Sequence, residues 1–103
     1  GRPAMKESPG SEFSIGVDLV LLAMGFVHPE HEGLVADLGV ELDGRGNIQT
    51  NGDRMTSIPG TFAAGDSVRG ASLVVWAIAE GRQAAHGIDT YLMGTSSLPQ
   101  VRV

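Results

Sequence analysis

The strongest pattern near the start of the chain is a continuous run of apolar residues. Residues 17–23 read Val-Asp-Leu-Val-Leu-Leu-Ala, and Gly25 ends the run. A short, partly β-branched run of this kind is typical of a parallel strand that is buried on both faces. It is interrupted by Asp18 and is too short to cross a bilayer. We therefore predict a buried strand over residues 17–23.

Shorter patterns in the middle of the chain predict one small helix and a β-hairpin. Residues 34–38 have helical spacing, and Gly39 suits a helix C-cap. Residues 40–42 and 47–49 flank a turn sequence that begins with Asp-Gly, which is a strong hairpin signal. A further short strand is predicted over residues 61–64, Thr-Phe-Ala-Ala.

The last element is predicted to be one long helix over residues 73–93, ended by Gly94. Its apolar face is formed by residues that recur at spacings of four and three: Val74, Ile78, Gly81, Ala85, Ile88 and Leu92. The two small residues in the middle of this face should let the helix approach a sheet closely. The polar residues fall mainly on the other, wetter faces: Glu80, Gln83, His86 and Asp89.

Composition is typical of a small globular domain and argues against several partners and cysteine-dependent functions. The chain has 103 residues, 42% of them hydrophobic, and a formal net charge of −5 without a Lys/Arg cluster. This charge argues against nucleic acid and anionic membranes as partners. The absence of cysteine excludes disulfides, thiolate catalysis and cysteine-ligated iron–sulfur clusters from this chain. No signal-peptide pattern is present, so the expected location is the cytoplasm.

The most informative part of the sequence is the corner that the chain is predicted to form between the end of strand 61–64 and the start of the helix 73–93. Gly65-Asp66 leaves a carboxylate at the strand tip. A carboxylate accepts hydrogen bonds and so suits ribose or ribityl hydroxyls, while Gly65 would let a ligand approach the backbone closely. Asp66 could instead cap its own turn. The residue types leave these two interpretations evenly balanced.

The start of the long helix offers complementary hydrogen-bond donors. The N–H groups of Ser72, Leu73, Val74 and Val75 have no acceptor within the helix. A helix N-terminus favours negative charge, and a flavin gains electron density on its N1/C2=O edge when it is reduced. Such a helix end should favour the reduced form. Ser72 could also be a simple N-cap, and the two roles are compatible.

Two other segments have a structural and a functional interpretation. Residues 28–32, His-Pro-Glu-His-Glu, could bind a metal, but Pro29 prevents a helical arrangement and no third ligand cluster is visible, so we favour a solvated loop. Residues 19–29 could be a crossover connection between two nucleotide-binding domains, although the residue types favour a core strand. Trp76 and Tyr91 are predicted to pack, and Trp76 is also a candidate for contact with a flavin edge.

Several expected motifs are missing from the chain. No Gly-x-Gly-x-x-Gly opens a helix, so the chain has no cradle for a dinucleotide pyrophosphate. No Ser/His/Asp arrangement lies at a recognisable nucleophile elbow. The residues therefore suggest a partial ligand site and no catalytic residue.

Three segments resemble the C-terminal FAD-binding part of pyridine-nucleotide-dependent flavoprotein oxidoreductases, and most of all the glutamate synthase small (beta) subunit family. They are GTFAAGD at 60–66, RGASLVVWAIAEGR at 69–82 and YLMG at 91–94. The segments at 9–30 and 38–50 are also similar to the preceding part of that family. The resemblance thus covers nearly the whole chain.

The resemblance implies an α/β fold, namely a partial Rossmann-like FAD/NAD(P)-binding domain with a β-hairpin and one long C-terminal helix. Residues 1–25 would be the end of an inserted NADPH-binding domain with its crossover strand, and residues 26–103 the C-terminal part of the FAD-binding domain. Asp66, next to Gly65, would bind the ribityl chain or an adjoining oxygen. Backbone N–H groups from Ser72 to Val75 would face the flavin pyrimidine edge.

The reaction implied by the resemblance is hydride transfer from NADPH to FAD. Electrons then pass through iron–sulfur clusters to a large subunit, where 2-oxoglutarate and glutamine become glutamate. The implied partners are upstream FAD and NADPH domains of the same chain and the glutamate synthase large subunit. Because both glycine fingerprints and the cluster cysteines belong to those upstream regions, we expect a C-terminal fragment that is inactive and without FAD on its own.

Two alternatives stay open at this point. One is a related NADPH- and FAD-dependent electron-transfer subunit, similar to dihydropyrimidine dehydrogenase. The other is a catalytically inert fragment that acts only as an assembly module. In a fragment, the helix 73–93 and the strand 17–23 would leave apolar surface exposed, which a homodimer could cover.

Overall fold

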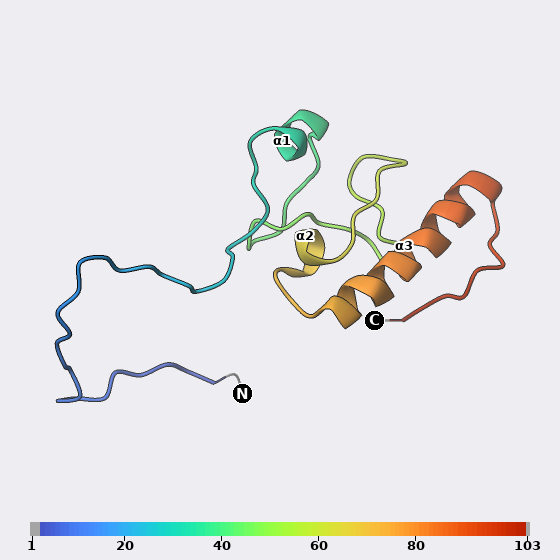
Figure 1. Cartoon of the computed structure of the whole chain (residues 1–103). Coiled ribbons are helices and arrows are strands. Elements are labelled where there is room, and N and C mark those ends of the chain that lie inside the picture. Colours follow the sequence, from blue (N-terminus) through green and yellow to red (C-terminus); the bar gives the residue numbers. More distant parts are fainter. Residues whose placement is uncertain (1–2, 103) are drawn as a thin grey trace.

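The computed structural model describes residues 3–102, which form a folded body with a long N-terminal arm (Figure 1). The body contains the helices α1 (Leu34–Leu38), α2 (Asp66–Arg69) and α3 (Val74–Met93). The Cα radius of gyration is 19.0 Å, whereas a compact chain of this length has about 13 Å. Residues 1, 2 and 103, at the ends of the two predicted domain ranges, lie outside the described residues.

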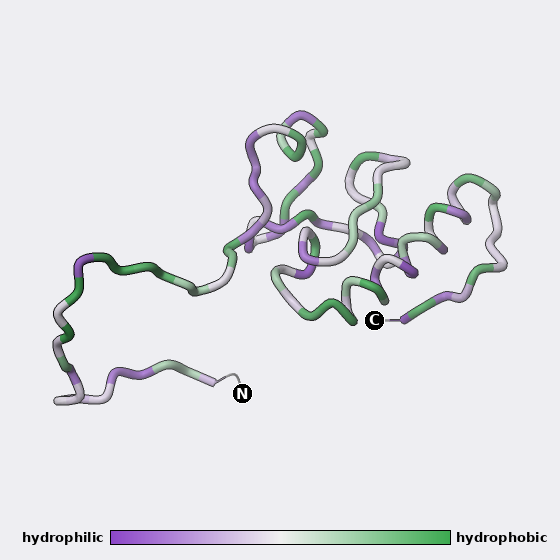
Figure 2. The backbone as a smooth tube through the Cα atoms, viewed as in Figure 1, coloured by the Kyte–Doolittle hydropathy of each residue, from purple (hydrophilic) through white to green (hydrophobic). Residues whose placement is uncertain are grey.

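The predicted buried strand over residues 17–23 is wrong for this structure. The segment belongs to the arm, residues 3–27, which has no strand pairing, and Leu21 and Leu22 are each 81% exposed. Figure 2 shows this part of the arm as mainly hydrophobic, with a hydrophilic interruption. A parallel strand needs neighbours that bond its backbone and helices that cover its faces. The body provides residues 17–23 with neither a paired strand nor a covering helix.

The short helix α1 confirms the pattern at residues 34–38. Gly39 closes it in the left-handed region at φ 70°, and its N–H donates to the carbonyl oxygens of Val35 and Ala36. Only glycine adopts this conformation without steric cost, which explains why the helix ends here.

The predicted β segments are reduced to single antiparallel bridges. Leu42 pairs with Ile48 across the turn at 43–46, and Met55 pairs with Phe62. Two hydrogen bonds flank the first bridge, from the Asp43 N–H to the Asn47 carbonyl oxygen at 2.7 Å and from the Gln49 N–H to the Glu41 carbonyl oxygen at 3.0 Å. The Ile48 N–H bonds outside this pair, to the carbonyl oxygen of Ser67 in α2 at 2.8 Å. Residues 61–64 contribute one bridged residue.

The long helix α3 confirms the predicted element to within one residue, but it buries a different face. Its buried residues are Glu80, Ala84 and Gly87, whereas Val74 is 73% exposed and Leu92 is 71% exposed. The close approach occurs at Gly87 and not at Gly81. A Cβ atom built at Gly87 would overlap the Asp53 carbonyl oxygen, and one at Gly81 would meet no atom within 4 Å.

Of the three helices found between residues 3 and 102, none combines the length and the apolar character that a membrane span requires.

Candidate functional site

The candidate site lies where α2 meets the start of α3. Gly65 precedes α2 with a positive φ of 76°, and Gly70 follows it with a positive φ of 91°. The Gly70 N–H donates to the Asp66 carbonyl oxygen at 3.0 Å. Glycines at both ends let α2 form one tight turn. This turn brings the chain back toward α3.

Asp66 closes its own loop and also borders an open hollow. Its Oδ1 accepts a hydrogen bond from the Ser72 N–H at 3.3 Å, which is the turn-capping contact. The side chain is exposed. It lines a hollow of about 280 Å³ together with Phe26, His28, Pro29, Ser67 and Ala71. This volume is just below the range of about 300–1,000 Å³ that is usual for ligand sites, and one carboxylate oxygen is available to a ligand there.

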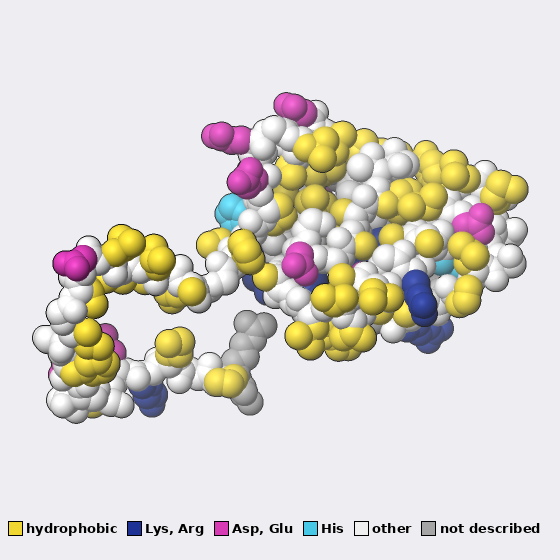
Figure 3. All heavy atoms as spheres, viewed as in Figure 1, with side chains coloured by type: hydrophobic (Ala, Val, Ile, Leu, Met, Phe, Trp, Pro, Cys, Tyr) yellow, Lys and Arg dark blue, Asp and Glu magenta, His cyan; other side chains and the backbone are white. Residues whose placement is uncertain are grey.

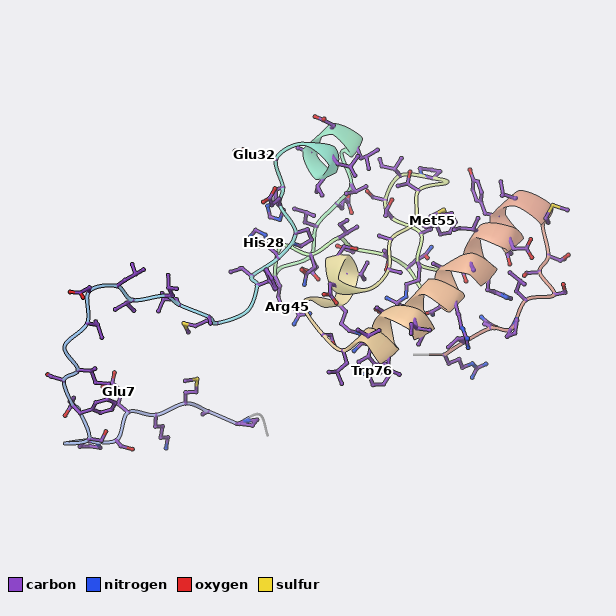
Figure 4. The ribbon with its side chains drawn as sticks, viewed as in Figure 1. Glu7, His28, Glu32, Arg45, Met55 and Trp76 are labelled. Atoms are coloured by element: carbon purple, nitrogen blue, oxygen red, sulfur yellow. The ribbon has the colours of Figure 1, made fainter. Side chains whose placement is uncertain are left out.

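Residues 26–29 bring the end of the apolar segment 19–29 to this hollow. His28 lies where the arm joins the body (Figure 4) and stacks on His31, with ring centroids 4.1 Å apart. The His31 Nε2 lies 2.8 Å from the Gly46 carbonyl oxygen. Within residues 3–102, no three side chains of His, Asp or Glu gather closely enough to hold a metal ion.

The start of α3 is exposed and carries no side-chain cap. The N-cap residue is Leu73, in an extended conformation, so the predicted capping role of Ser72 is wrong. Leu73 is 67% exposed and Val75 is 62% exposed. The N–H groups of Val74 and Val75 make no hydrogen bond to any residue of the described range 3–102. These donors are therefore open to an acceptor outside the chain.

Beneath this corner lies the most buried carboxylate of the described residues, Glu80, which is 1% exposed. Its Oε1 lies 2.9 Å from Arg54 Nη1 and its Oε2 lies 3.5 Å from Arg69 Nε. Oε2 also accepts the Gly65 N–H at 3.2 Å. A buried carboxylate needs such partners to offset its lost hydration.

The sequence prediction placed Glu80 on a wet face and missed this cluster. Arg54 lies in a loop far from α3 in the chain, so no local spacing pairs the two residues. The neighbours of Glu80 in the sequence do not mark its burial either, because a Cβ at Gly81 would meet no atom within 4 Å and the close approach of α3 occurs at Gly87.

The aromatic residues of α3 pack against the body. Tyr91 meets Phe62 edge to face, with ring centroids 6.0 Å apart. The guanidinium of Arg69 lies 4.7 Å from the centre of the Trp76 ring, and Trp76 lies near the start of α3 (Figure 4). Arg69 therefore binds both Glu80 and Trp76, so that a positive charge lies beside the first turn of α3.

The arrangement offers a ligand one carboxylate acceptor and two backbone N–H donors. The Asp66 carboxylate suits hydroxyl groups, and the open N–H groups of Val74 and Val75 suit a polar edge that gains negative charge. These are the parts of FAD that the sequence assigned to this corner. The roles of Gly65, Asp66 and residues 72–75 remain predictions, since their placement is compatible with FAD and with a capped turn.

Comparison with known proteins gives matches over most of the chain. The pyridine nucleotide-disulphide oxidoreductase family matches residues 4–81. The glutamate synthase (NADPH) small chain of Mycobacterium tuberculosis (strain H37Rv) is 61% identical over 90 residues, which are 87% of this chain and 18% of that protein. The small chain of Bacillus subtilis (strain 168) is 44% identical over 99 residues, which are 96% of this chain and 20% of that protein. Glutamate synthase (NADH) of Schizosaccharomyces pombe is 49% identical over 100 residues, which are 96% of this chain and 5% of that protein. The chain spans about a fifth, or less, of the length of these curated relatives.

Proposed function

Because the chain belongs to the pyridine nucleotide-disulphide oxidoreductase family, whose fold is Rossmann-like, we propose that it forms the C-terminal part of the FAD-binding domain of a glutamate synthase small-subunit-like oxidoreductase. The 61% identity over 90 residues to a glutamate synthase small chain supports this assignment. The observation that carries it is the joint placement of Asp66 and the uncapped start of α3.

The proposed division of the chain follows the sequence analysis. Residues 1–25 end an inserted NADPH-binding domain and cross back, and residues 26–103 complete the FAD-binding domain. Two features support this division. The arm leaves the body before residue 28, and Phe26, the first residue of the second range, lines the same hollow as Asp66. The start of the proposed FAD-binding part therefore lies next to the candidate FAD corner.

The contribution of this chain is to bind and orient. FAD, when bound, would accept hydride from NADPH, and the electrons would continue through iron–sulfur clusters to a large subunit that forms glutamate. The Asp66 carboxylate accepts hydrogen bonds from ribityl hydroxyls. The N–H groups of Val74 and Val75 donate to the pyrimidine edge, and the α3 N-terminus favours its negative charge. The large subunit is the proposed partner and the cytoplasm the proposed location.

A chimera tests this proposal, because the chain spans about a fifth of its bacterial relatives. The matched segment of the M. tuberculosis small chain is replaced by this chain, and the unmodified relative is measured in parallel. We expect the chimera to purify with the same FAD content as the relative and NADPH to bleach its flavin absorbance without oxygen. A folded chimera that lacks FAD would contradict the proposal.

The isolated chain provides the second arm of the test. It contains no Gly-x-Gly-x-x-Gly cradle for the pyrophosphate, so we expect no FAD binding at micromolar concentrations. Flavin fluorescence titration measures this directly. Micromolar binding by the isolated chain would show that the corner binds FAD without a glycine-rich pyrophosphate cradle.

A further inference from the structure

Glu80 connects the segments that form the candidate FAD corner. We propose that Glu80 is the positioning residue of this corner, because it fixes both ends of α2 against the first turns of α3 and thereby sets where Asp66 lies relative to the open N–H groups of Val74 and Val75. This inference rests on the proposed function and goes one step beyond it, since Glu80 itself does not line the hollow that Asp66 borders.

The contacts of one carboxylate oxygen hold α2 at its two ends. Glu80 Oε2 accepts the N–H of Gly65, the residue directly before Asp66, at 3.2 Å. The same oxygen forms a longer ion pair, at 3.5 Å, with Nε of Arg69, the last residue of α2, and this Nε makes no hydrogen bond within residues 3–102. Since Glu80 belongs to α3, these contacts fix α2 to the helix whose N-terminus completes the corner. A charged acceptor makes a stronger bond to a backbone N–H than a neutral one does.

The second carboxylate oxygen is held by a residue in a strained conformation. Arg54 Nη1 lies 2.9 Å from Glu80 Oε1. Arg54 has φ 65° and is the one non-glycine residue between positions 3 and 102 with a positive φ. Its Nε donates to Gln83 Oε1 at 2.9 Å, so that α3 holds this guanidinium at two points. Strain of this kind persists only where surrounding contacts impose it. Here the contacts direct Arg54 toward Glu80.

The cluster also has a net charge that matters for a flavin. Two guanidinium groups face one carboxylate, which leaves one positive charge in excess beneath the corner. Arg69 places part of that charge beside the first turn of α3, because it also lies over the Trp76 ring. The excess has the same sign as the N-terminal end of the α3 dipole. Removing the Glu80 charge should therefore stabilise a reduced, negatively charged flavin further, even while it loosens the corner.

The experiment measures the flavin of the chimera, with Glu80→Gln and Glu80→Asp as variants. Glu41→Gln is the matched control, because Glu41 is an exposed carboxylate whose side chain is outside the cluster. Three quantities are compared: the FAD dissociation constant, the midpoint potential of the bound flavin and the midpoint temperature of unfolding. We expect Glu80→Gln to raise the FAD dissociation constant by about tenfold or more. It should also move the midpoint potential in the positive direction.

Glu80→Asp and Glu41→Gln separate positioning from general stability. Glu80→Asp keeps the charge on a shorter side chain, so we expect a midpoint potential near that of the parent and an intermediate FAD dissociation constant. Glu41→Gln should change neither. Should Glu80→Gln prove too unstable, Arg69→Gln removes one contact and leaves the Glu80–Arg54 pair. We expect it to weaken FAD binding and to move the midpoint potential in the negative direction.

The outcomes distinguish this inference from the function on which it rests. If the parent chimera binds no FAD, the proposed function fails. If the parent binds FAD and a folded Glu80→Gln variant keeps both the dissociation constant and the midpoint potential while its unfolding temperature falls, Glu80 is merely structural and the inference is overturned.

Discussion

Gly81 and Gly87 lie six residues apart on α3, which at 3.6 residues per turn places them on different faces with different surroundings. A Cβ at Gly87 would overlap the Asp53 carbonyl oxygen, and one at Gly81 would meet nothing within 4 Å. We expect Gly87→Ala to destabilise the fold by about 1–3 kcal/mol, because the helix must move away from the loop it packs on. Urea unfolding followed by the fluorescence of Trp76, the single tryptophan, measures this loss.

Gly81→Ala is the matched control for that experiment. Alanine at an open helical position is better than glycine by up to about 1 kcal/mol, so this variant should unfold at the same or a higher urea concentration. Equal losses of stability in both variants would show that α3 does not pack on the Asp53 backbone through Gly87.

We expect the stability of the turn at residues 43–46 to depend on pH through Asp43. Its Oδ1 accepts the backbone N–H groups of Arg45 at 2.8 Å and of Asn47 at 3.1 Å. These two bonds, in that order, lower the pKa of Asp43 below its ordinary value of 3.8. A carboxyl group with a lowered folded-state pKa stabilises the fold above its ordinary pKa, and this contribution is lost as the pH falls through the lowered value. We expect Asp43→Asn to flatten the acid limb of unfolding temperature against pH. The same slope in both proteins below pH 3.8 would exclude this role for Asp43.

The loop contact of Asp66 was one of two interpretations that the sequence left open, whereas the contacts of Glu80 were not predicted. The Asp66 carboxylate accepts the N–H of Ser72, a few residues further along the chain, so the local turn sequence was enough to suggest a capping contact. The role of Asp66 toward FAD stays a prediction. The partners of Glu80 come from two separate segments, the loop at Arg54 and α2 with its preceding Gly65. A pattern along one helix cannot detect charges that arrive from elsewhere, and it placed Glu80 on the wrong face.

At the scale of elements, α3 begins without a side-chain cap, which leaves stability to be gained. Leu73 already has the extended conformation of an N-cap, with φ −77° and ψ 147°. We expect Leu73→Asp and Leu73→Asn to stabilise α3 by about 0.5–2 kcal/mol, because their side-chain oxygens can accept the free N–H groups of the first turn. Thermal unfolding followed by circular dichroism measures the gain.

The same two variants should weaken FAD binding in the chimera. Either cap occupies N–H groups that we assign to the flavin edge, and aspartate adds a negative charge that repels a reduced flavin. We expect the largest loss of affinity for Leu73→Asp, a smaller one for Leu73→Asn, and little change for Leu73→Ala, which offers no acceptor. Unchanged FAD affinity in a stabilised Leu73→Asp variant would remove the α3 start from the FAD site.

Helices could be predicted from this sequence more reliably than strands. Both α1 and α3 end at glycines in the left-handed region, Gly39 and Gly94, and their spacing is visible within the segment itself. A strand depends on partners elsewhere in the chain, and the segment 17–23 finds none among the described residues. The buried face of α3 could not be predicted from the helix sequence either, because it depends on the packing of Gly87 against the loop at Asp53. The family resemblance, which depends on longer motifs, is confirmed.

At the scale of the whole molecule, the chain exposes more apolar surface than a folded monomer usually does. Figure 3 shows apolar side chains along the arm and around the start of α3. The arm residues Leu19, Leu21, Leu22 and Phe26 are between 74% and 87% exposed. Exposed apolar patches of this kind mark surfaces that other protein segments cover. In the proposed parent protein, the remainder of the FAD and NADPH domains would cover them.

The isolated chain should therefore associate with itself through the arm, and one pair of variants tests whether apolar burial is the cause. Leu21→Glu and Ser14→Glu each add one negative charge to the arm, but only the first removes a large apolar side chain. Burying a leucine is worth about 1.5–3 kcal/mol, so we expect Leu21→Glu to raise the concentration at which association begins by about tenfold or more. Ser14→Glu should raise it far less. Light scattering after size-exclusion chromatography, over a range of loading concentrations, gives the oligomeric state of each protein. If both variants raise the association concentration equally, charge repulsion along the arm, and not apolar burial, controls self-association. If the parent chain stays monomeric at every loading concentration, the exposed apolar residues of the arm do not drive self-association.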